Sequence, residues 1–315
     1  MASQRPEIIE SATQNRRAEV AEIAPSLDCL RRASPAHSRA MPAADSRSRV
    51  LLRRLGFAVL VAMLAYLALA YTLAPLLWSR FTHQQGLASM RFITRTPLGI
   101  AGDPLNVGLE GDQAEVVCSM HAAGWLPADP VTLKSSAHIA ASVLLRRPYL
   151  DAPVSDLFYL GRREDLAFEK PSGRSPGTRH HVRFWKVIDQ GEAGRPVWLG
   201  AATFDRSVGL SHYTGQITHH IAADIDAERD SVSADLASAD KVEAIFEISG
   251  IGPTMRGRNG GGDPYFTDGE ILFSRLVPGC DSKASGPPEQ LPNPPAISMK
   301  NWFWRQAKAL WQALT

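Results

Sequence analysis

An uncharged apolar run, Leu55–Trp78 (LGFAVLVAMLAYLALAYTLAPLLW), constrains this chain more than any other feature. A bilayer core requires about 20 apolar residues in a helix that rises about 1.5 Å per residue, and the run is at least that long. Trp78 lies at its end, where an interfacial indole belongs, and Pro75 falls in the last turn, where the loss of one backbone hydrogen bond is tolerated. The run predicts one transmembrane helix over residues 55–78.

The orientation of this helix follows from the arginines on its two sides. Arginines before the run are Arg31, Arg32, Arg39, Arg47, Arg49, Arg53 and Arg54, and those soon after it are Arg80, Arg91 and Arg95. Because cytoplasmic flanks carry the excess of positive charge, we expect a cytoplasmic N-terminus and an extracytoplasmic main domain. A cleaved signal peptide ending near Ala68–Ala70 is the competing interpretation, but the run is long and begins far into the chain. Residues 1–54 predict a disordered basic segment, and Met41 is an alternative start.

Charge and cysteine content exclude some classes of protein. The net charge of +2 leaves no excess of Lys and Arg for a phosphate backbone, so we expect no nucleic-acid partner. Cys29, Cys118 and Cys280 form no CxxC pair, which excludes the usual cysteine metal sites. Cys118 and Cys280 could pair in an oxidising compartment, but cysteines this far apart in sequence are more often buried as small apolar side chains, and we expect them unpaired.

The part of the chain beyond the membrane run alternates short β-type and helical patterns. β-type runs end in turns that contain Gly or Pro, and the expected helices are 111–123, 132–147 and 226–239. The pattern predicts an α+β domain over residues 99–280, with a mixed, mainly antiparallel sheet and about three helices. We expect a connector over residues 79–98 and a Pro-rich linker over residues 281–296. Residues 250–262 predict a flexible glycine-rich loop.

A set of longer strings carries a family resemblance. The strings are DPLNVGLEG (103–111), AGWLPADPVTLKSS (123–136), RRPYLDAPVSDLFYLGRREDLAFEKP (146–171), RHHVRFW (179–185), VWLGAATFDRSVGLS (197–211) and THHIAADIDAERD (218–230). Over roughly residues 102–242 the chain resembles the LssY C-terminal domain family of bacteria. The resemblance implies a bacterial inner-membrane protein with a link to secretion. It brings no established catalytic residues, and one helix here replaces the membrane modules that often precede the domain.

Histidines and acids concentrate in one part of this domain. His181, His219 and Asp226 are the candidate catalytic residues, and the candidate metal ligands are His180, His212, His220 and Asp224. Imidazole and carboxylate together suit a divalent metal such as zinc, manganese or iron, and a His beside a carboxylate can act as a general base. Against this, neighbouring histidines in a strand point to opposite faces, and acids after Asp224 are also typical of a helix N-terminus.

Arginines form a further candidate site, for an anion such as a lipid phosphate. Its members are Arg162, Arg163, Arg183 and Arg206. Guanidinium groups bind phosphate in a bidentate manner, but the same arginines could form a solvated strand face that pairs with nearby acids. We favour the solvated face.

The C-terminal residues 297–315 predict an amphipathic helix. Phe303, Ala307, Leu310, Trp311 and Leu314 recur at helical spacing, with basic residues opposite. This composition fits a helix that lies in a membrane interface, and equally one that docks on a protein. Two functions remain open: a membrane-anchored envelope domain that binds a lipid or a secretion-system protein, and a membrane-anchored, phosphatase-like hydrolase that uses the His/Asp residues.

Overall fold

A computed structural model of the chain describes residues 46–128, 156–173, 177–249 and 252–314. The chain divides after Tyr66 into two compact units, and the second unit, Leu67–Thr315, contains the folded domain. The expected helix over residues 132–147 and most of the expected disordered segment lie outside the described residues.

The apolar run forms a helix that begins earlier than expected. α1 (Ser46–Ala68) continues through a π-helical turn (Leu69–Leu73) into α2 (Ala74–Ser79), and residues 47–79 are long and apolar enough to cross a membrane. Residues 46–54 are therefore helical rather than disordered, because the arginine-rich stretch contains no helix breaker. In the π-helical turn the Ala74 N–H donates to the Leu69 carbonyl, just before Pro75, whose missing N–H disturbs the regular ladder.

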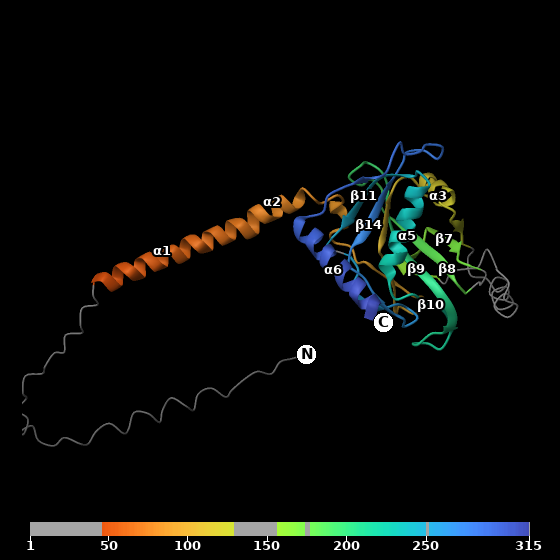
Figure 1. The fold of residues 1–315 in the computed structure, drawn as a ribbon, viewed down its shortest axis with the longest axis horizontal. Helices are drawn as coiled ribbons and strands as arrows, with labels where there is room; N and C mark the ends of the chain where they lie inside the picture. Colours follow the sequence, from red (N-terminus) through yellow and green to blue (C-terminus); the bar gives the residue numbers. More distant parts are fainter. Residues whose placement is uncertain (1–45, 129–155, 174–176, 250–251, 315) are drawn as a thin grey trace, which may run out of the picture. The chain divides into compact units, whose positions relative to one another are not determined.

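A nine-stranded sheet forms the centre of the domain (Figure 1). Along its main path the strands are β15 (Glu289–Gln290), β11 (Val242–Ile248), β14 (Ile271–Leu276), β3 (Val107–Glu110), β9 (Val197–Leu210), β8 (Arg179–Ile188), β7 (Leu166–Pro171) and β4 (Leu126–Pro127). β10 (Ile217–Ile221) pairs with β9 off this path. Among these described pairs β14–β3 and β11–β15 are parallel and the rest antiparallel, which confirms the predicted α+β fold with a mixed, mainly antiparallel sheet.

Two smaller sheets complete the strands. The first has the order β2 (Ala101–Pro104), β1 (Ile93–Arg95), β5 (Phe158–Tyr159) and β6 (Arg162–Arg163). The second is the hairpin of β12 (Arg256–Arg258) and β13 (Pro264–Phe266), which lies in and beside the glycine-rich stretch that was expected to be a flexible loop.

Helices α3 (Gln113–Ala122) and α5 (Ile225–Ser238) pack on one face of the large sheet (Figure 1). Asp112 and Glu115 form a capping box at the start of α3, and the Asp224 side chain accepts the Ala227 N–H at the start of α5. Because strand side chains alternate between faces, Val182 packs in the core under these helices while Trp185 packs in the core on the opposite face. The large sheet therefore has a core on both sides.

The domain reaches further at both ends than the sequence patterns predict. The expected connector contains a 3-10 turn (Gln85–Leu87) and strand β1, and Leu87 is fully buried. The expected Pro-rich linker contains β15, which pairs with β11, and Leu291 packs against the core. Both stretches lack periodicity in the sequence, and short strand pairings together with the burial of single side chains hold them in place.

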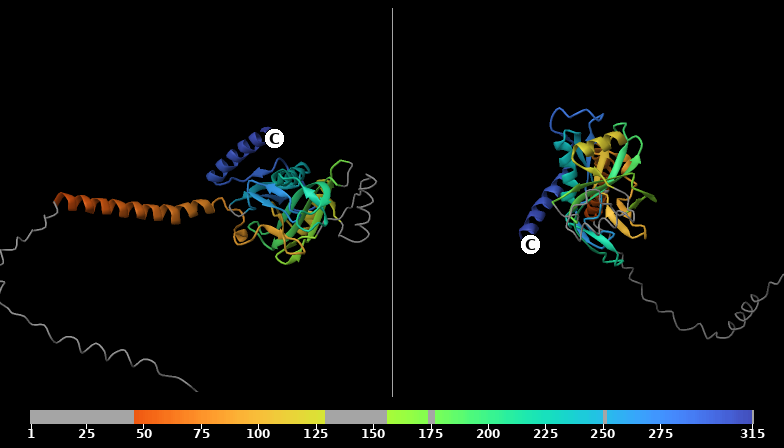
Figure 2. Two further views of the ribbon diagram at one scale, coloured as in Figure 1. Left: turned by 90° about the horizontal axis from the view of Figure 1, so that it is seen from below. Right: turned by 90° about the vertical axis from the view of Figure 1, so that its right-hand side faces the viewer.

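The C-terminal helix α6 (Pro295–Leu314) lies along the outside of the domain (Figure 2). Its Lys300 donates to the Asp268 carbonyl at 2.6 Å, and Lys308 pairs with Asp224 at 2.7 Å. Asn301 is buried and donates to Glu247 at 2.7 Å. The polar side of the helix therefore faces the domain.

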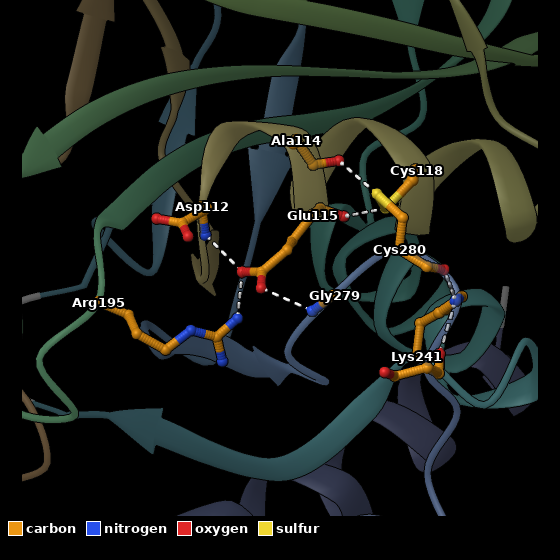
Figure 3. Close-up of a disulfide and its surroundings, with 9 residues drawn as sticks. Asp112, Ala114, Glu115, Cys118, Arg195, Lys241, Gly279 and Cys280 are labelled. Atoms are coloured by element: carbon orange, nitrogen blue, oxygen red, sulfur yellow. Dashed lines mark hydrogen bonds and ion pairs between the residues drawn. A yellow bond between two sulfur atoms is a disulfide. The ribbon is translucent and has the colours of Figure 1, made fainter.

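Cys118 and Cys280 form a disulfide, which corrects the expectation that they are unpaired (Figure 3). Glu115 of α3 links the two cysteine-bearing segments, because its side chain accepts the backbone N–H of Gly279, next to Cys280, at 2.8 Å. The same side chain accepts the Asp112 N–H at the start of α3 at 2.7 Å. Burial acts to raise the pKa of Glu115, but these bonds and Arg195 outweigh it and hold the pKa below its usual range. The two cysteines are 162 residues apart in the sequence. They come together in space because β14, which precedes Cys280, lies beside β3, which precedes α3 and Cys118.

Candidate functional site

A cavity of about 380 Å³ opens at the end of the sheet where β8, β9 and β10 meet. The turn between β1 and β2 and the turn between β12 and β13 contribute the rest of its wall, through residues such as Leu98 and Gly260. The cavity therefore collects side chains from segments far apart in the sequence. Five of its polar members, which we call the cavity cluster, are Arg179, His181, Arg183, Asp205 and His219.

The alternation of β8 explains why three of these residues share the cavity. Arg179, His181 and Arg183 are two residues apart, so they project from the same face of the strand. The next residue of this series, Trp185, lies in the apolar core, so the cavity is the polar continuation of that core face. His180 lies on the other face, where its Nδ1 is 2.8 Å from Glu228 of α5.

Asp205 of β9 is the centre of the cavity cluster. Its Oδ2 accepts the Arg179 Nε–H at 3.1 Å and lies 3.1 Å from His181 Nδ1 and 3.9 Å from His219 Nδ1. His181 Nε2 is 2.7 Å from the Thr203 hydroxyl, and Arg179 also bonds Glu169 at 2.7 Å. The imidazole of His181 is thus hydrogen-bonded at Nε2, while its Nδ1 lies beside the Asp205 carboxylate without a hydrogen bond to it.

The electrostatics of the cluster separate its members into charged and neutral groups. Burial acts to raise the pKa of Asp205, but His181, His219 and Arg179 outweigh burial and hold that pKa well below its usual range. Burial lowers the pKa of His219 to about 4, with Arg179 and His181 adding to the effect and Asp205 opposing it. At neutral pH the site therefore contains an ionised carboxylate beside a neutral imidazole.

Several buried polar atoms of the cluster have no hydrogen-bond partner in the described structure. They are Arg183 Nε, His181 Nδ1, His219 Nε2 and Asp205 Oδ1. Buried polar groups without partners are costly, at about 1–3 kcal/mol each, and are rare unless a ligand or water completes them. Their position around one cavity indicates a binding site for a polar group.

The rim of the cavity is partly apolar. Leu98 is 66% exposed and Ile217 is 79% exposed, and both line the cavity. The exposed Thr214 and Gln216 line it as well. The cavity thus combines a polar floor with a rim that contains large apolar side chains.

Two of the sequence-predicted catalytic residues, His181 and His219, meet in this cavity, and the third does not. Asp226 lies at the start of α5, where its Oδ2 accepts the Asp268 N–H at 2.8 Å. Asp224, a predicted metal ligand, caps α5 and pairs with Lys308. His180 packs under α5, away from the cavity.

The predicted arginine site is divided in the same way. Only Arg183 reaches the cavity, where its Nη1 lies 3.4 Å from Asp103. Arg162 pairs with Asp165, and Arg163 pairs with Asp156, both as partly exposed ion pairs. Arg206 is exposed on β9. The last three fit the solvated face, whereas Arg183 fits the anion site.

The other two predicted metal ligands, His212 and His220, meet at a separate place. Their ring centroids are 5.3 Å apart, and both face Asp263. Asp263 and Asp205 were not among the site residues predicted from the sequence. A signal for Asp205 was present, because a carboxylate inside a run of apolar strand residues, as in VWLGAATFD, requires a buried partner.

The structure is an α+β domain that follows one helix long and apolar enough to cross a membrane, and it contains a cavity with a polar floor. The family model described as LssY C-terminus matches residues 84–271, more than half of the chain. The chain belongs to this family, as the resemblance predicted. No curated protein and no solved structure matches it.

Proposed function

We propose that this protein is a single-pass, membrane-anchored domain of the bacterial envelope that binds the headgroup of an anionic amphiphile in the cavity. The observation that supports it is the polar cluster beneath a partly apolar rim. Arg183 Nε and the unpaired imidazole nitrogens offer donors to a phosphate or carboxylate, while Leu98 and Ile217 offer apolar contact to the adjoining chain. An amphiphile satisfies both parts at once.

The test uses the full chain in maltoside micelles with a water-soluble, short-chain phosphatidylglycerol as the probe. Arg183→Met and His219→Ala should each weaken binding about 10-fold, since a hydrogen bond to a charged group contributes about 1.5–3 kcal/mol. Arg206→Met is the matched control, because this exposed arginine lies next to Asp205 but not in the cavity. Equal affinity of all variants would contradict the proposal. Inorganic phosphate as a second probe separates headgroup recognition from recognition of the amphiphile.

The domain is placed outside the cytoplasm in this proposal. The Cys118–Cys280 disulfide supports it, because disulfides persist in oxidising compartments and are rare in the bacterial cytoplasm. The arginines before the membrane helix support it as well, because an excess of positive charge on that flank favours a cytoplasmic N-terminus at the inner membrane. A reporter active only outside the cytoplasm, fused after Thr315, should be active. Activity of a cytoplasm-specific reporter instead would reverse the orientation.

Helix α6 provides a second contact with the bilayer in this proposal. Met299, Trp302, Phe303 and Leu310 form one face of the helix and are 51–63% exposed, while the polar face is bonded to the domain. An amphipathic helix with its apolar face turned outward is typical of a membrane-surface helix. The start of α6 also lies close to the end of the predicted membrane helix. His83, which follows α2, is 3.3 Å from the carbonyl of Pro292, which comes shortly before α6.

This contact can be tested with a fluorophore on α6 of the reconstituted full chain. We expect brominated lipids to quench a label at Phe303→Cys strongly, and a label at Arg305→Cys, off the apolar face, much less. The variants are made in a Cys29→Ser background so that the label reacts at one thiol. Equal quenching at both positions would contradict a lipid contact through the apolar face, and a protein partner would then be the better occupant.

A hydrolase is the second candidate, because Asp205 lies beside two imidazoles and His219 is neutral at neutral pH. Such an imidazole can act as a general base. Turnover of a phosphate monoester or diester by the full chain, lost in His181→Ala and His219→Ala but kept in Asp226→Asn, would support it. Absence of turnover in the wild-type protein leaves the binding function as the better description of the cavity.

A further inference from the structure

Three side chains from three segments meet beside β10, on the side that faces away from the cavity. His219 of β10 lines the cavity, so its neighbour His220 projects from the opposite face. There His220 Nδ1 lies 2.8 Å from Asp263 Oδ1, and His212 Nε2 lies 3.5 Å from the same oxygen. One ligand atom from each of the three residues lies within 4.8 Å of the other two.

Asp263 is the anchored member of this group. Its side chain is 1% exposed, its Oδ2 accepts the Ile221 N–H at 3.1 Å, and its own N–H bonds to Asn259 Oδ1 at 2.9 Å. The ion-pair partners of Asp263 among the described residues are His212 and His220, and neither lysine nor arginine is among them. A buried carboxylate is costly unless a positive charge compensates it. Because the groups that face Asp263 are imidazoles, a cation bound between them would supply that charge.

The types of ligand atom indicate which cation fits the site. Two imidazole nitrogens and one carboxylate oxygen suit zinc, whereas magnesium and calcium prefer oxygen ligands. Ligands of a tetrahedral zinc with bonds of about 2.0–2.1 Å are about 3.4 Å apart. Asp263 Oδ1 lies 3.5 Å from His212 Nε2, close to this spacing, and 2.8 Å from His220 Nδ1, which would move apart slightly to admit the ion. His212 has a side chain that is 59% exposed, so its ring is free to approach and water has access to the fourth position.

We propose that His212, His220 and Asp263 bind one Zn²⁺ ion, with water completing the coordination. The ion would join the β9–β10 turn, which carries His212, to the turn between β12 and β13, which ends at Asp263. The two turns already touch, because the His212 N–H donates to the Gly261 carbonyl at 2.8 Å. Since Gly261 and Asn259 line the cavity, the ion would also stiffen one wall of it.

The experiment uses the full chain, purified through a tag without histidines in a Cys29→Ser background and stripped with EDTA in maltoside micelles. Zn²⁺ titration against a chromophoric chelator should give one site per chain, and Co²⁺ should give the visible absorption of a four-coordinate site. His212→Ala and Asp263→Asn should each weaken Zn²⁺ binding about 100-fold, since each removes a direct ligand and even outer partners count for about 10–100-fold. His121→Ala, an exposed histidine of α3, is the matched control and should change nothing.

His212→Ala is the decisive variant because it alters an exposed turn and should leave the fold intact. Asp263→Asn keeps an oxygen for the Ile221 N–H, and the melting temperature of each stripped variant checks its fold. Zn²⁺ should raise the melting temperature of the wild-type chain but not that of His212→Ala. Absence of Zn²⁺ binding by the wild type, equal binding by His212→Ala, or tighter binding of Mg²⁺ or Ca²⁺ would overturn the proposal. None of these readouts depends on a cavity ligand.

Discussion

The cavity cluster and a second buried cluster beneath α5 and α6 both place arginine beside carboxylate but differ in how the hydrogen-bond donors are used. The second group, which we call the helix cluster, comprises Asp226, Arg229, Glu247, Asp268 and Glu270. Each guanidinium nitrogen of Arg229 donates a hydrogen bond, to Asp230, Asp268 or the Glu270 carbonyl. The buried atoms of the helix cluster that have no hydrogen-bond partner in the described structure are carboxylate oxygens, Asp226 Oδ1 and Glu270 Oε2, whereas in the cavity cluster the nitrogens Arg183 Nε and His219 Nε2 have none.

This difference separates a structural role from a binding role. The helix cluster joins α5 to the loop before β14 and, through Lys300 and Asn301, to α6. Its arginine is fully engaged and holds the fold together. The cavity cluster leaves buried nitrogens without hydrogen-bond partners beside the cavity, so part of its hydrogen-bonding capacity remains for a ligand. Residue type alone does not distinguish the two roles.

The largest expected effect is that of Arg229→Met. It removes the cation from a buried group of acids, and breaking a buried ion pair from one side costs about 3–5 kcal/mol. We expect a loss of that size in the free energy of unfolding, measured by denaturant unfolding of the full chain in micelles. Arg206→Met, an exposed arginine, should change it by less than about 0.5 kcal/mol. Similar small effects for both variants would remove the distinction between the clusters.

Asp226→Asn tests the acidic side of the helix cluster through its pH dependence. Burial raises the pKa of Asp226 to about 6, with Asp268 adding to the effect and Arg229 opposing it. Because the folded-state pKa is above the unfolded value, the stabilisation from protonation is complete below about pH 4 and is lost as pH rises through about 6. The asparagine variant should therefore be about 1–2 kcal/mol more stable than the wild type at pH 7.5 and gain nothing at pH 4. An equal difference at both pH values would contradict this assignment.

Arg183→Met tests the cavity cluster in the opposite sense. Its contact with Asp103 is long, at 3.4 Å, and its Nε has no partner, so its removal should cost no more than about 1 kcal/mol of stability. The same variant should lose ligand affinity. A stability loss as large as that of Arg229→Met would show that the cavity cluster is structural.

The smallest effect is expected on the outer face of α6. Phe303 is 59% exposed, so Phe303→Ser should change the free energy of unfolding in micelles by about 0.5 kcal/mol or less. Its effect should appear instead as weaker quenching by brominated lipid of a label on α6. A large loss of stability would place this side chain in a protein contact.

Much of the domain could be predicted from the sequence, because each strand of the large sheet carries a local pattern. The apolar run Ile271–Leu276 forms β14, and RHHVRFW lies inside β8. The alternation in that string determines which of its histidines faces the cavity. Strand β9 continues beyond its apolar run, since polar residues from Asp205 onward are stabilised by pairing with β10.

The candidate site was predicted only in part, and the missing residues share a cause. His181 and His219 were predicted because they are chemically conspicuous, whereas Asp205 and Asp263 are single carboxylates whose importance depends on what lies opposite. The disulfide was missed for the same reason. Cys118 and Cys280 become neighbours only when α3 packs beside the end of β14.

The sequence by itself determined the membrane helix, the α+β class and the family, because apolar length, strand alternation and motif strings are local properties of the chain. The tertiary structure alone decided which histidines meet, which arginine is left with a free donor, and that α6 turns its apolar face outward. These outcomes depend on contacts between different segments of the chain, such as that of Arg183 with Asp103 at a separation of 80 residues, and local sequence patterns do not contain that information.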